Sequence, residues 1–203
     1  MKILCIGKNY AEHVKEMRSA IPAEPVYFMK PDTALLKDGY PFYLPDFSKD
    51  VQHEVEIVIK INKNGKCIDE KFAHKYFDEF TVGIDFTARD IQWQCKEKGL
   101  PWEKAKAFDN SAPIGRFIAV NKFTSIDALD FHLDVNGKTV QKGNTKEMIF
   151  SFAKCISYVS RFHTLKTGDL IYTGTPEGVG PVKAGDKLEA FLDTEKLLEF
   201  DVK

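Results

Sequence analysis

Two glutamates in an apolar segment are the first residues of this chain that could do chemistry. The segment 51–61 reads Val-Gln-His-Glu-Val-Glu-Ile-Val-Ile-Lys-Ile, and successive side chains of a strand point to opposite faces. Val51, Val55 and the isoleucines would share one face, while Glu54 and Glu56 would share the other. Parallel carboxylates repel unless water or a cation separates them. The pair is therefore either a solvated outer face or two ligands for a hard divalent cation such as Mg2+, and a third carboxylate would favour the cation.

A third carboxylate follows a short apolar run. Thr81 to Ile84 reads as a buried strand, which would deliver Asp85 at its C-terminal end. Thr87 then resembles an N-cap, with Asp90 in the first turn of a helix that ends near Gly99.

Three polar residues of this predicted helix share one face at helical spacing, namely Arg89, Gln92 and Lys96. A cation in the first turn opposes the helix dipole by about 0.3–1 kcal/mol, which favours a role in holding an anion. The alternative is a surface bridge from Arg89 to Asp90 or Glu97.

A histidine and a glutamate near the N-terminus form a further candidate group. Asn9 and Glu12 resemble a capping box, which predicts a short helix. His13 and Glu16, three residues apart, would lie on one face of it. This spacing fits either a surface ion pair or a general base whose ring Glu16 orients.

Two lysines and a glycine-rich loop complete the candidates. Lys104 and Lys106 are expected in a loop after Trp102. The segment 173–181 lacks the Gly-Lys-Ser/Thr ending of a nucleotide-binding loop, so we reject that function. Its backbone N–H groups and the Thr175 hydroxyl can still bind an anion.

Short strands and a few helices must position these residues. Asn136-Gly137 is a strong hairpin signal, and apolar residues at spacings of three and four predict a helix over 152–162. Mixed spacing predicts a second short helix over 72–80. The predicted strands are 3–6, 26–29, 51–61, 81–84, 129–135, 138–142, 170–173 and 188–192.

Composition narrows the class of protein. The chain has 203 residues and a formal net charge of −1, which argues against a nucleic-acid partner. No apolar run approaches the roughly 20 residues that span a bilayer. The N-terminal apolar stretch is too short for a secretory signal, and the four cysteines are scattered, without a Cys-x-x-Cys pair. These features predict a cytoplasmic protein with reduced thiols and no membrane association.

Five short motifs occur in order along nearly the whole chain. They are Gly-Lys-Asn-Tyr-Ala-Glu-His13, His-Glu-Val-Glu56, Gly-Ile-Asp-Phe-Thr-Ala-Arg-Asp-Ile-Gln92, Lys-Gly-Leu-Pro-Trp102 through Lys106, and Thr-Gly-Thr-Pro-Glu-Gly-Val-Gly-Pro181. Together they resemble the fumarylacetoacetate hydrolase superfamily, in its small single-domain acylpyruvate hydrolase branch. The resemblance implies an α+β fold, a mixed β-sandwich or β-roll with a few short helices. It also implies one catalytic domain over 1–203, an N-terminal lid at about 8–20, and a homodimer.

The resemblance also implies roles for individual residues. Glu54, Glu56 and Asp85 would hold one Mg2+ or Mn2+ ion. The remaining matches are a water-activating dyad of His13 and Glu16, a set that binds the substrate's acid and oxo groups, and Lys30, whose role stays open. The substrate-binding set is Arg89, Gln92, Lys106 and Thr175, of which Lys106 also has a catalytic role.

The implied reaction is hydrolysis of the C3–C4 bond of a 2,4-dioxo acid, an acylpyruvate. His13 would take a proton from the attacking water, and Lys106 with the metal would stabilise the enolate of pyruvate. Alternatives within the family are oxaloacetate decarboxylation or tautomerisation, and hydrolysis or isomerisation of fumarylpyruvate and related intermediates of aromatic degradation. A ligand-binding protein that keeps only the fold and the metal is a more distant alternative.

Overall fold

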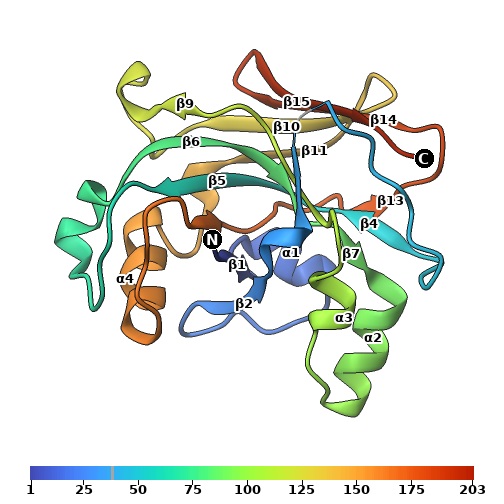
Figure 1. Cartoon of the computed structure of the whole chain (residues 1–203), viewed down its shortest axis with the longest axis horizontal. Helices are drawn as coiled ribbons and strands as arrows, with labels where there is room; N and C mark the ends of the chain where they lie inside the picture. The colour runs from blue at the N-terminus through green and yellow to red at the C-terminus, as the bar shows by residue number, and fades with distance from the viewer. Residues whose placement is uncertain (38) are drawn as a thin grey trace.

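A curled mixed sheet forms the centre of the fold (Figure 1). The computed structural model describes residues 1–37 and 39–203, and in that part of the chain eight strands form this sheet. The order is β2-β1-β12-β5-β6-β8-β3, with β9 paired to β6. The strands are β1 (Ile3–Gly7), β2 (Val26–Lys30), β3 (Leu35–Lys37), β5 (Val55–Ile61), β6 (Phe77–Ile84), β8 (Ala112–Ile114), β9 (Ile118–Ala119) and β12 (Leu170–Tyr172).

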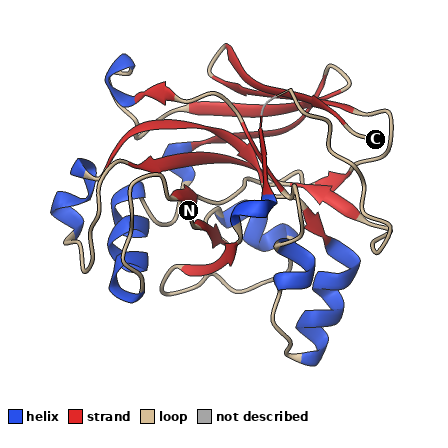
Figure 2. Ribbon diagram, viewed as in Figure 1, coloured by secondary structure: helices blue, strands red, loops and turns tan. Residues whose placement is uncertain are grey.

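Two smaller sheets and a few short helices complete the fold. The four-stranded sheet has the order β11-β10-β14-β15 and lies above the central sheet in Figure 2, while α2, α3 and α4 lie below it. Its strands are β10 (Asp130–Val135), β11 (Lys138–Asn144), β14 (Lys187–Leu192) and β15 (Glu195–Asp201); the third sheet contains β13 (Gly180–Pro181), β4 (Val51–His53) and β7 (Thr87–Ala88). The α-helices are α1 (Ala11–Glu16), α2 (Arg89–Lys98), α3 (Glu103–Lys106) and α4 (Phe152–Phe162). Short 3-10 turns are η1 (Asp32–Ala34), η2 (Glu70–Lys75), η3 (Val120–Lys122) and η4 (Thr145–Glu147).

Strand β5 is buried on both faces because apolar side chains cover each side of the central sheet. Ile57 and Ile59 belong to the large hydrophobic core, whereas Val58, on the opposite face, packs with Ile3 and Tyr172 in a smaller cluster. A strand in this position has no solvated face, so its polar residues must find partners inside the protein.

The predicted strand 51–61 is divided at Glu54. Residues before the break form β4, which pairs with β7 and β13, and residues after it form β5, which pairs with β12 and β6. The chain therefore changes sheet at Glu54. Apolar alternation continues through this point, so the sequence pattern did not indicate the break.

Two helix predictions need correction. The segment 72–80 was predicted as one helix, but η2 ends at Lys75 and β6 begins at Phe77. Pairing of β6 with β5 and β9 overrides the weak helical spacing. Asn9 does not cap α1, because its buried side chain bonds to backbone atoms of Phe150 and Thr173 instead.

The other local predictions that positioned the site agree better with the structure. The Asn136-Gly137 turn joins β10 and β11, with positive φ at both residues, and α4 spans the predicted 152–162. Helix α2 begins at Arg89 after Ala88 rather than after a Thr87 cap, and it ends at Gly99 in the left-handed conformation. Among residues 1–37 and 39–203, none of the helices has the length and apolar character needed to cross a bilayer.

Candidate metal centre and active site

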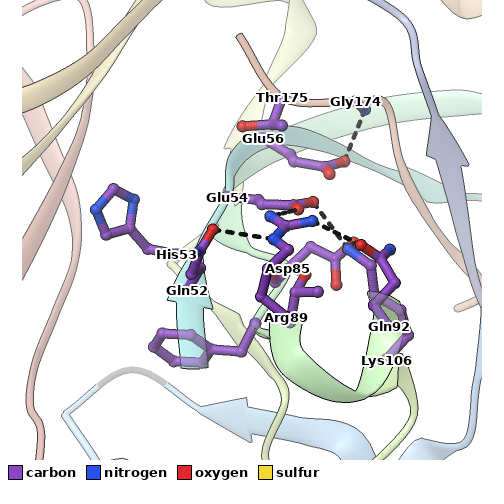
Figure 3. A network of polar contacts seen from close by, with 12 residues as sticks. Gln52, His53, Glu54, Glu56, Asp85, Arg89, Gln92, Lys106, Gly174 and Thr175 are labelled. Atoms are coloured by element: carbon purple, nitrogen blue, oxygen red, sulfur yellow. Dashed lines mark hydrogen bonds and ion pairs between the residues drawn. The ribbon is translucent and has the colours of Figure 1, made fainter. Parts of the chain in front are cut away.

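Three buried carboxylates converge at the end of the β5–β6 pair. Glu54 lies at the junction of β4 and β5, Glu56 lies on β5, and Asp85 follows β6. The antiparallel register places Glu56 opposite Gly83, and Asp85 N–H donates to the Glu54 carbonyl over 2.8 Å. One oxygen of each carboxylate lies within 4.8 Å of the others (Figure 3). The interpretation of a solvated outer face is therefore wrong.

The electrostatics of these carboxylates differ. Burial raises the pKa of Glu56 well above its ordinary value, and the charges of Asp85 and Glu54 raise it further, although Glu56 accepts a 2.7 Å hydrogen bond from Gly174 N–H. Burial also acts to raise the pKa of Glu54, but the nearby cations Lys106 and Arg89 hold it below its ordinary value. A cation close to Glu56 would remove the repulsion that the three groups share.

Lys106 bridges two of the three carboxylates. Its Nζ donates to Glu54 Oε2 over 2.8 Å and to Asp85 Oδ2 over 2.7 Å. Burial acts to lower its pKa, but Asp85 and Glu54 raise it above the ordinary value, so Lys106 stays charged. It ends the short helix α3, where a loop was predicted, whereas Lys104 of the same helix is exposed.

Arg89 pairs with a buried carboxylate of the site rather than with a surface residue. Its Nη2 lies 2.5 Å from Glu54 Oε1, and its other nitrogens donate to Gln52 Oε1 and Gln92 Oε1 over 2.9 and 2.8 Å. Figure 3 shows this network, in which Gln92 and Arg89 project from the first turn of α2. The alternative of a surface bridge to Asp90 or Glu97 is therefore wrong.

Lys30 holds the third carboxylate from inside the protein. Its side chain is fully buried, and its Nζ lies 2.8 Å from Asp85 Oδ1. It also donates to the carbonyl and hydroxyl oxygens of Ser111 over 2.8 and 2.9 Å. The sequence showed only a lysine before Pro31 at the end of an apolar strand, so its partners could not be identified there.

His13 and Glu16 form the contact that their spacing predicted. His13 Nδ1 lies 3.0 Å from Glu16 Oε2, and Glu16 Oε1 accepts a 3.0 Å hydrogen bond from Gly178 N–H. His13 is buried and Glu16 is partly exposed. The second contact ties α1 to the glycine-rich loop, so the carboxylate fixes the orientation of the imidazole ring.

Gln141 was missed by the sequence analysis, although it connects several parts of the site. Its Oε1 accepts from Val55 N–H over 3.0 Å and lies 2.9 Å from His53 Nδ1. Its Nε2 donates to Thr175 Oγ1 and to the Pro176 carbonyl over 2.9 and 3.0 Å. Burial lowers the pKa of His53, which favours a neutral ring that donates to this oxygen. Gln141 lies on β11, far along the chain from its partners, and no local motif marks it.

These side chains line one pocket, which is open to solvent. All predicted site residues line it except Glu16, which reaches it through His13. The lining also contains Lys96, which was placed on the same helix face as Arg89 and Gln92, and residues that were not predicted for the site, among them Lys8, Ser19, Phe28 and Trp102.

The donor set fits a hard divalent cation. Such ions take carboxylate oxygens, and Glu54, Glu56 and Asp85 are three buried carboxylates whose oxygens lie close together without a thiol or imidazole among them. Burial and the repulsion from Asp85 and Glu54 raise the pKa of Glu56, and a bound cation would relieve that repulsion. Glu54, Glu56 and Asp85 can therefore hold a metal.

Comparisons with known proteins identify the family of this chain. The family model "Fumarylacetoacetate (FAA) hydrolase C-terminal" matches residues 2–202. The mouse protein "Oxaloacetate tautomerase FAHD1, mitochondrial" is 47% identical over 201 residues, which cover 99% of this chain and 91% of the mouse protein. "Oxaloacetate tautomerase YcgM" of Escherichia coli (strain K12) is 44% identical over 197 residues, 97% of this chain and 90% of that protein.

A solved structure extends the comparison to bound ligands. Fumarylpyruvate hydrolase from Pseudomonas aeruginosa, in complex with Mn2+ and pyruvate, superposes with a TM-score of 0.94 at 35% identity. The match covers 100% of this chain and 89% of that one. The chain belongs to the fumarylacetoacetate hydrolase family, a family of enzymes, and its mixed sheets with a few short helices confirm the predicted α+β fold.

Proposed function

We propose that this chain is a metal-dependent enzyme that forms the enol or enolate of a 2-oxo acid, with tautomerisation of oxaloacetate as its principal reaction. The observation that carries the proposal is the convergence of three buried carboxylates, the Lys106 ammonium and the His13 ring on one pocket. The named relatives at 44–47% identity support oxaloacetate as the substrate.

Glu54, Glu56 and Asp85 are the proposed metal ligands. A bound Mg2+ or Mn2+ would act as a Lewis acid toward the 1-carboxylate and 2-oxo oxygens of the substrate. Oxygen ligands suit both ions, and Mn2+ is the ion in the related fumarylpyruvate hydrolase structure. We propose Mg2+ as the resident ion, with Mn2+ as a functional substitute.

The cations and amides of the chain would orient the acid and stabilise charge. Lys106 is charged and buried, so its ammonium is suited to hydrogen-bond the 2-oxo oxygen as negative charge develops there. Gln92 and the Thr175 hydroxyl line the same pocket and would fix the acid group. We retain Arg89 among the proposed substrate-binding residues, although its guanidinium already contacts Glu54.

His13 would carry the proton. In the tautomerisation the C3–H bond breaks and its proton passes to the free ring nitrogen of His13. The electron pair of the C3–H bond forms the C2=C3 double bond. The electrons displaced from the C2=O bond collect on the oxygen, which takes up a proton to give the enol. Glu16 holds Nδ1 and thereby leaves Nε2 for this transfer.

Hydrolysis of acylpyruvates is the second candidate, and the His13–Glu16 contact favours it. A histidine base can activate water, whose oxygen attacks C4 while the C3–C4 bond breaks and its electrons form the enolate of pyruvate. Decarboxylation of oxaloacetate forms the same enolate but needs no attacking water. One site can therefore support these reactions in different proportions.

The deciding experiment is a direct comparison of substrates. Purified protein with Mg2+, and again with a chelator, would be given enol-oxaloacetate, with ultraviolet absorbance reporting tautomerisation and pyruvate release reporting decarboxylation. Acetylpyruvate would be given in parallel. Metal-dependent loss of the enol at a rate well above its spontaneous decay supports the proposal. Cleavage of acetylpyruvate without any effect on oxaloacetate would replace it by the hydrolase function.

Three expectations about the whole molecule remain predictions. We propose that residues 1–203 act as one catalytic domain, that the segment 8–20 closes over bound substrate, and that the enzyme works as a cytoplasmic homodimer. The position of His13 on α1 supports the second of these, because this residue of the segment is buried and lines the pocket. Hydrogen exchange of residues 8–20 with and without pyruvate would test the lid. Light scattering would test the dimer.

A further inference from the structure

Two lysines that line the pocket have no role in the proposed reaction. Lys8 follows β1, and Lys96 lies on α2 one turn after Gln92. Both line the pocket that holds the three carboxylates. In residues 1–37 and 39–203 neither ammonium forms an ion pair, whereas Lys106 and Arg89 are already paired with Glu54. Lys8 and Lys96 are therefore the lining cations that are free to meet an anionic ligand.

Each of these lysines is held in a way that keeps it at the pocket. Lys96 Nζ lies 4.7 Å from the ring centroid of Trp93 and 5.7 Å from that of Trp102. Lys8 has a φ of +60°, a conformation that residues other than glycine and asparagine adopt at a cost. The adjacent Asn9 stabilises this turn through its buried hydrogen bonds. Strained residues of this kind are concentrated at functional sites.

The pocket lining has more cationic than anionic side chains. Four cations, Lys8, Arg89, Lys96 and Lys106, line it together with the three carboxylates. With all three carboxylates ionised the lining carries about one net positive charge, and a bound divalent ion would raise this to about three, which favours a ligand with more than one negative charge. Burial, Arg89 and Lys8 lower the pKa of Lys96 to about 8, which shows that this ammonium lacks a nearby anion of sufficient strength.

We propose that Lys96, assisted by Lys8, binds the second carboxylate of a dicarboxylic 2-oxo acid and thereby sets the specificity of the enzyme for dianions over acylpyruvate monoanions. The inference rests on the proposed function, because it assumes that the 2-oxo acid end of the substrate binds at Lys106 and the three site carboxylates. It assigns the opposite end of the substrate to Lys96 and Lys8, and Ser19 adds a hydroxyl to the same pocket lining. Neither lysine takes part in the proton transfer.

Binding of unreactive ligands tests this proposal without relying on turnover. L-Malate and L-lactate share a 2-hydroxy acid group, and only malate carries a second carboxylate. Calorimetric titration of the Mg2+-loaded protein would compare them in wild type, Lys96→Gln and Lys8→Asn. The Asn variant tolerates positive φ. Lys98→Gln is the matched control, because Lys98 is an exposed lysine of the same helix.

We expect wild type to bind malate at least about tenfold more tightly than lactate, since a charge-assisted hydrogen bond contributes on that scale. Lys96→Gln should remove most of this preference, Lys8→Asn part of it, and Lys98→Gln none, with lactate affinity unchanged throughout. Equal affinities in wild type, equal losses of malate and lactate in Lys96→Gln, or no binding of either acid would overturn the inference. Failure of oxaloacetate turnover with a retained, Lys96-dependent malate preference would instead reject only the proposed reaction.

Discussion

Lys30 Nζ lies 2.8 Å from Asp85 Oδ1, while Lys106 Nζ lies 2.7 Å from Oδ2 of the same carboxylate. Both lysines are buried, so Asp85 is held between two ammonium groups that water does not screen. Glu54 is held in a similar way by Lys106 and Arg89. The cations of the site thus position its carboxylates before any ligand binds.

Replacing Lys30 by methionine should destabilise the protein strongly. Removal of one partner from a buried ion pair typically costs about 3–5 kcal/mol, because the other charge stays buried. Lys60→Met is the control, since the Lys60–Glu79 pair is partly exposed and should change the unfolding free energy by less than about 1 kcal/mol. Denaturant unfolding of the metal-free variants measures both, and equal losses would contradict the role of Lys30.

Glu56→Gln and Glu54→Gln should both lose metal binding but should differ in stability. Burial and the neighbouring carboxylates raise the pKa of Glu56, which favours the neutral form of this carboxyl without metal, so the neutral amide should replace it at little cost. Glu54 is ionised and paired with Lys106 and Arg89, so its amide should lose about 3–5 kcal/mol of unfolding free energy. Calorimetry should show that both variants lose Mg2+ binding. A Glu56→Gln protein as unstable as Glu54→Gln would argue against this difference.

His13→Gln should separate the proposed reactions. Removal of a general base typically lowers the rate about 10²–10⁴-fold, so tautomerisation and acetylpyruvate cleavage should fall by this factor. Decarboxylation of oxaloacetate needs no base to take a proton from water or from C3, so this activity should be largely retained. His74→Gln, at an exposed histidine, is the control. The measurement is kcat for each substrate, and an equal loss of all three activities would contradict the assignment.

The affinity for malate should depend on pH through Lys96. Its pKa is about 8, lowered by burial and by the cations Arg89, Lys8 and Lys106 against the opposing effect of Glu54. Lys96 is therefore charged below pH 8 and loses its charge as the pH rises through that value. The Kd of malate should rise between pH 7 and 9 while that of lactate stays flat. Calorimetry at several pH values tests this, and the same pH dependence in Lys96→Gln would assign it to another group.

Local sequence patterns predicted the elements whose contacts are local. Apolar spacing identified α4, the Asn-Gly pair identified the β10–β11 turn, and a strand followed by Asp85 indicated the third carboxylate. The spacing of His13 and Glu16 likewise predicted their contact. In each case the determining interactions lie within a few residues of one another, so the pattern carries the information.

The residues that were missed act over long distances in the sequence. Lys30 contacts Asp85 and Ser111, and Gln141 contacts Val55 and Thr175, in each case through pairings that only the sheet topology creates. The same topology made residues 77–80 a strand, where spacing alone had suggested a helix.

The change of sheet at Glu54 has a consequence for the choice of metal. Glu56 is fixed within the paired ladder of β5, whereas Glu54 stands between two sheets, outside the strands on either side. Larger cations such as Ca2+ need oxygen distances of about 2.3–2.6 Å, compared with about 2.0–2.1 Å for Mg2+. A small rotation at Glu54 would break no ladder hydrogen bond, but it would shift the contacts of this carboxylate with Lys106 and Arg89. We therefore expect Glu54 to adjust more than Glu56 when ions of different radius bind, and to do so against these two cations.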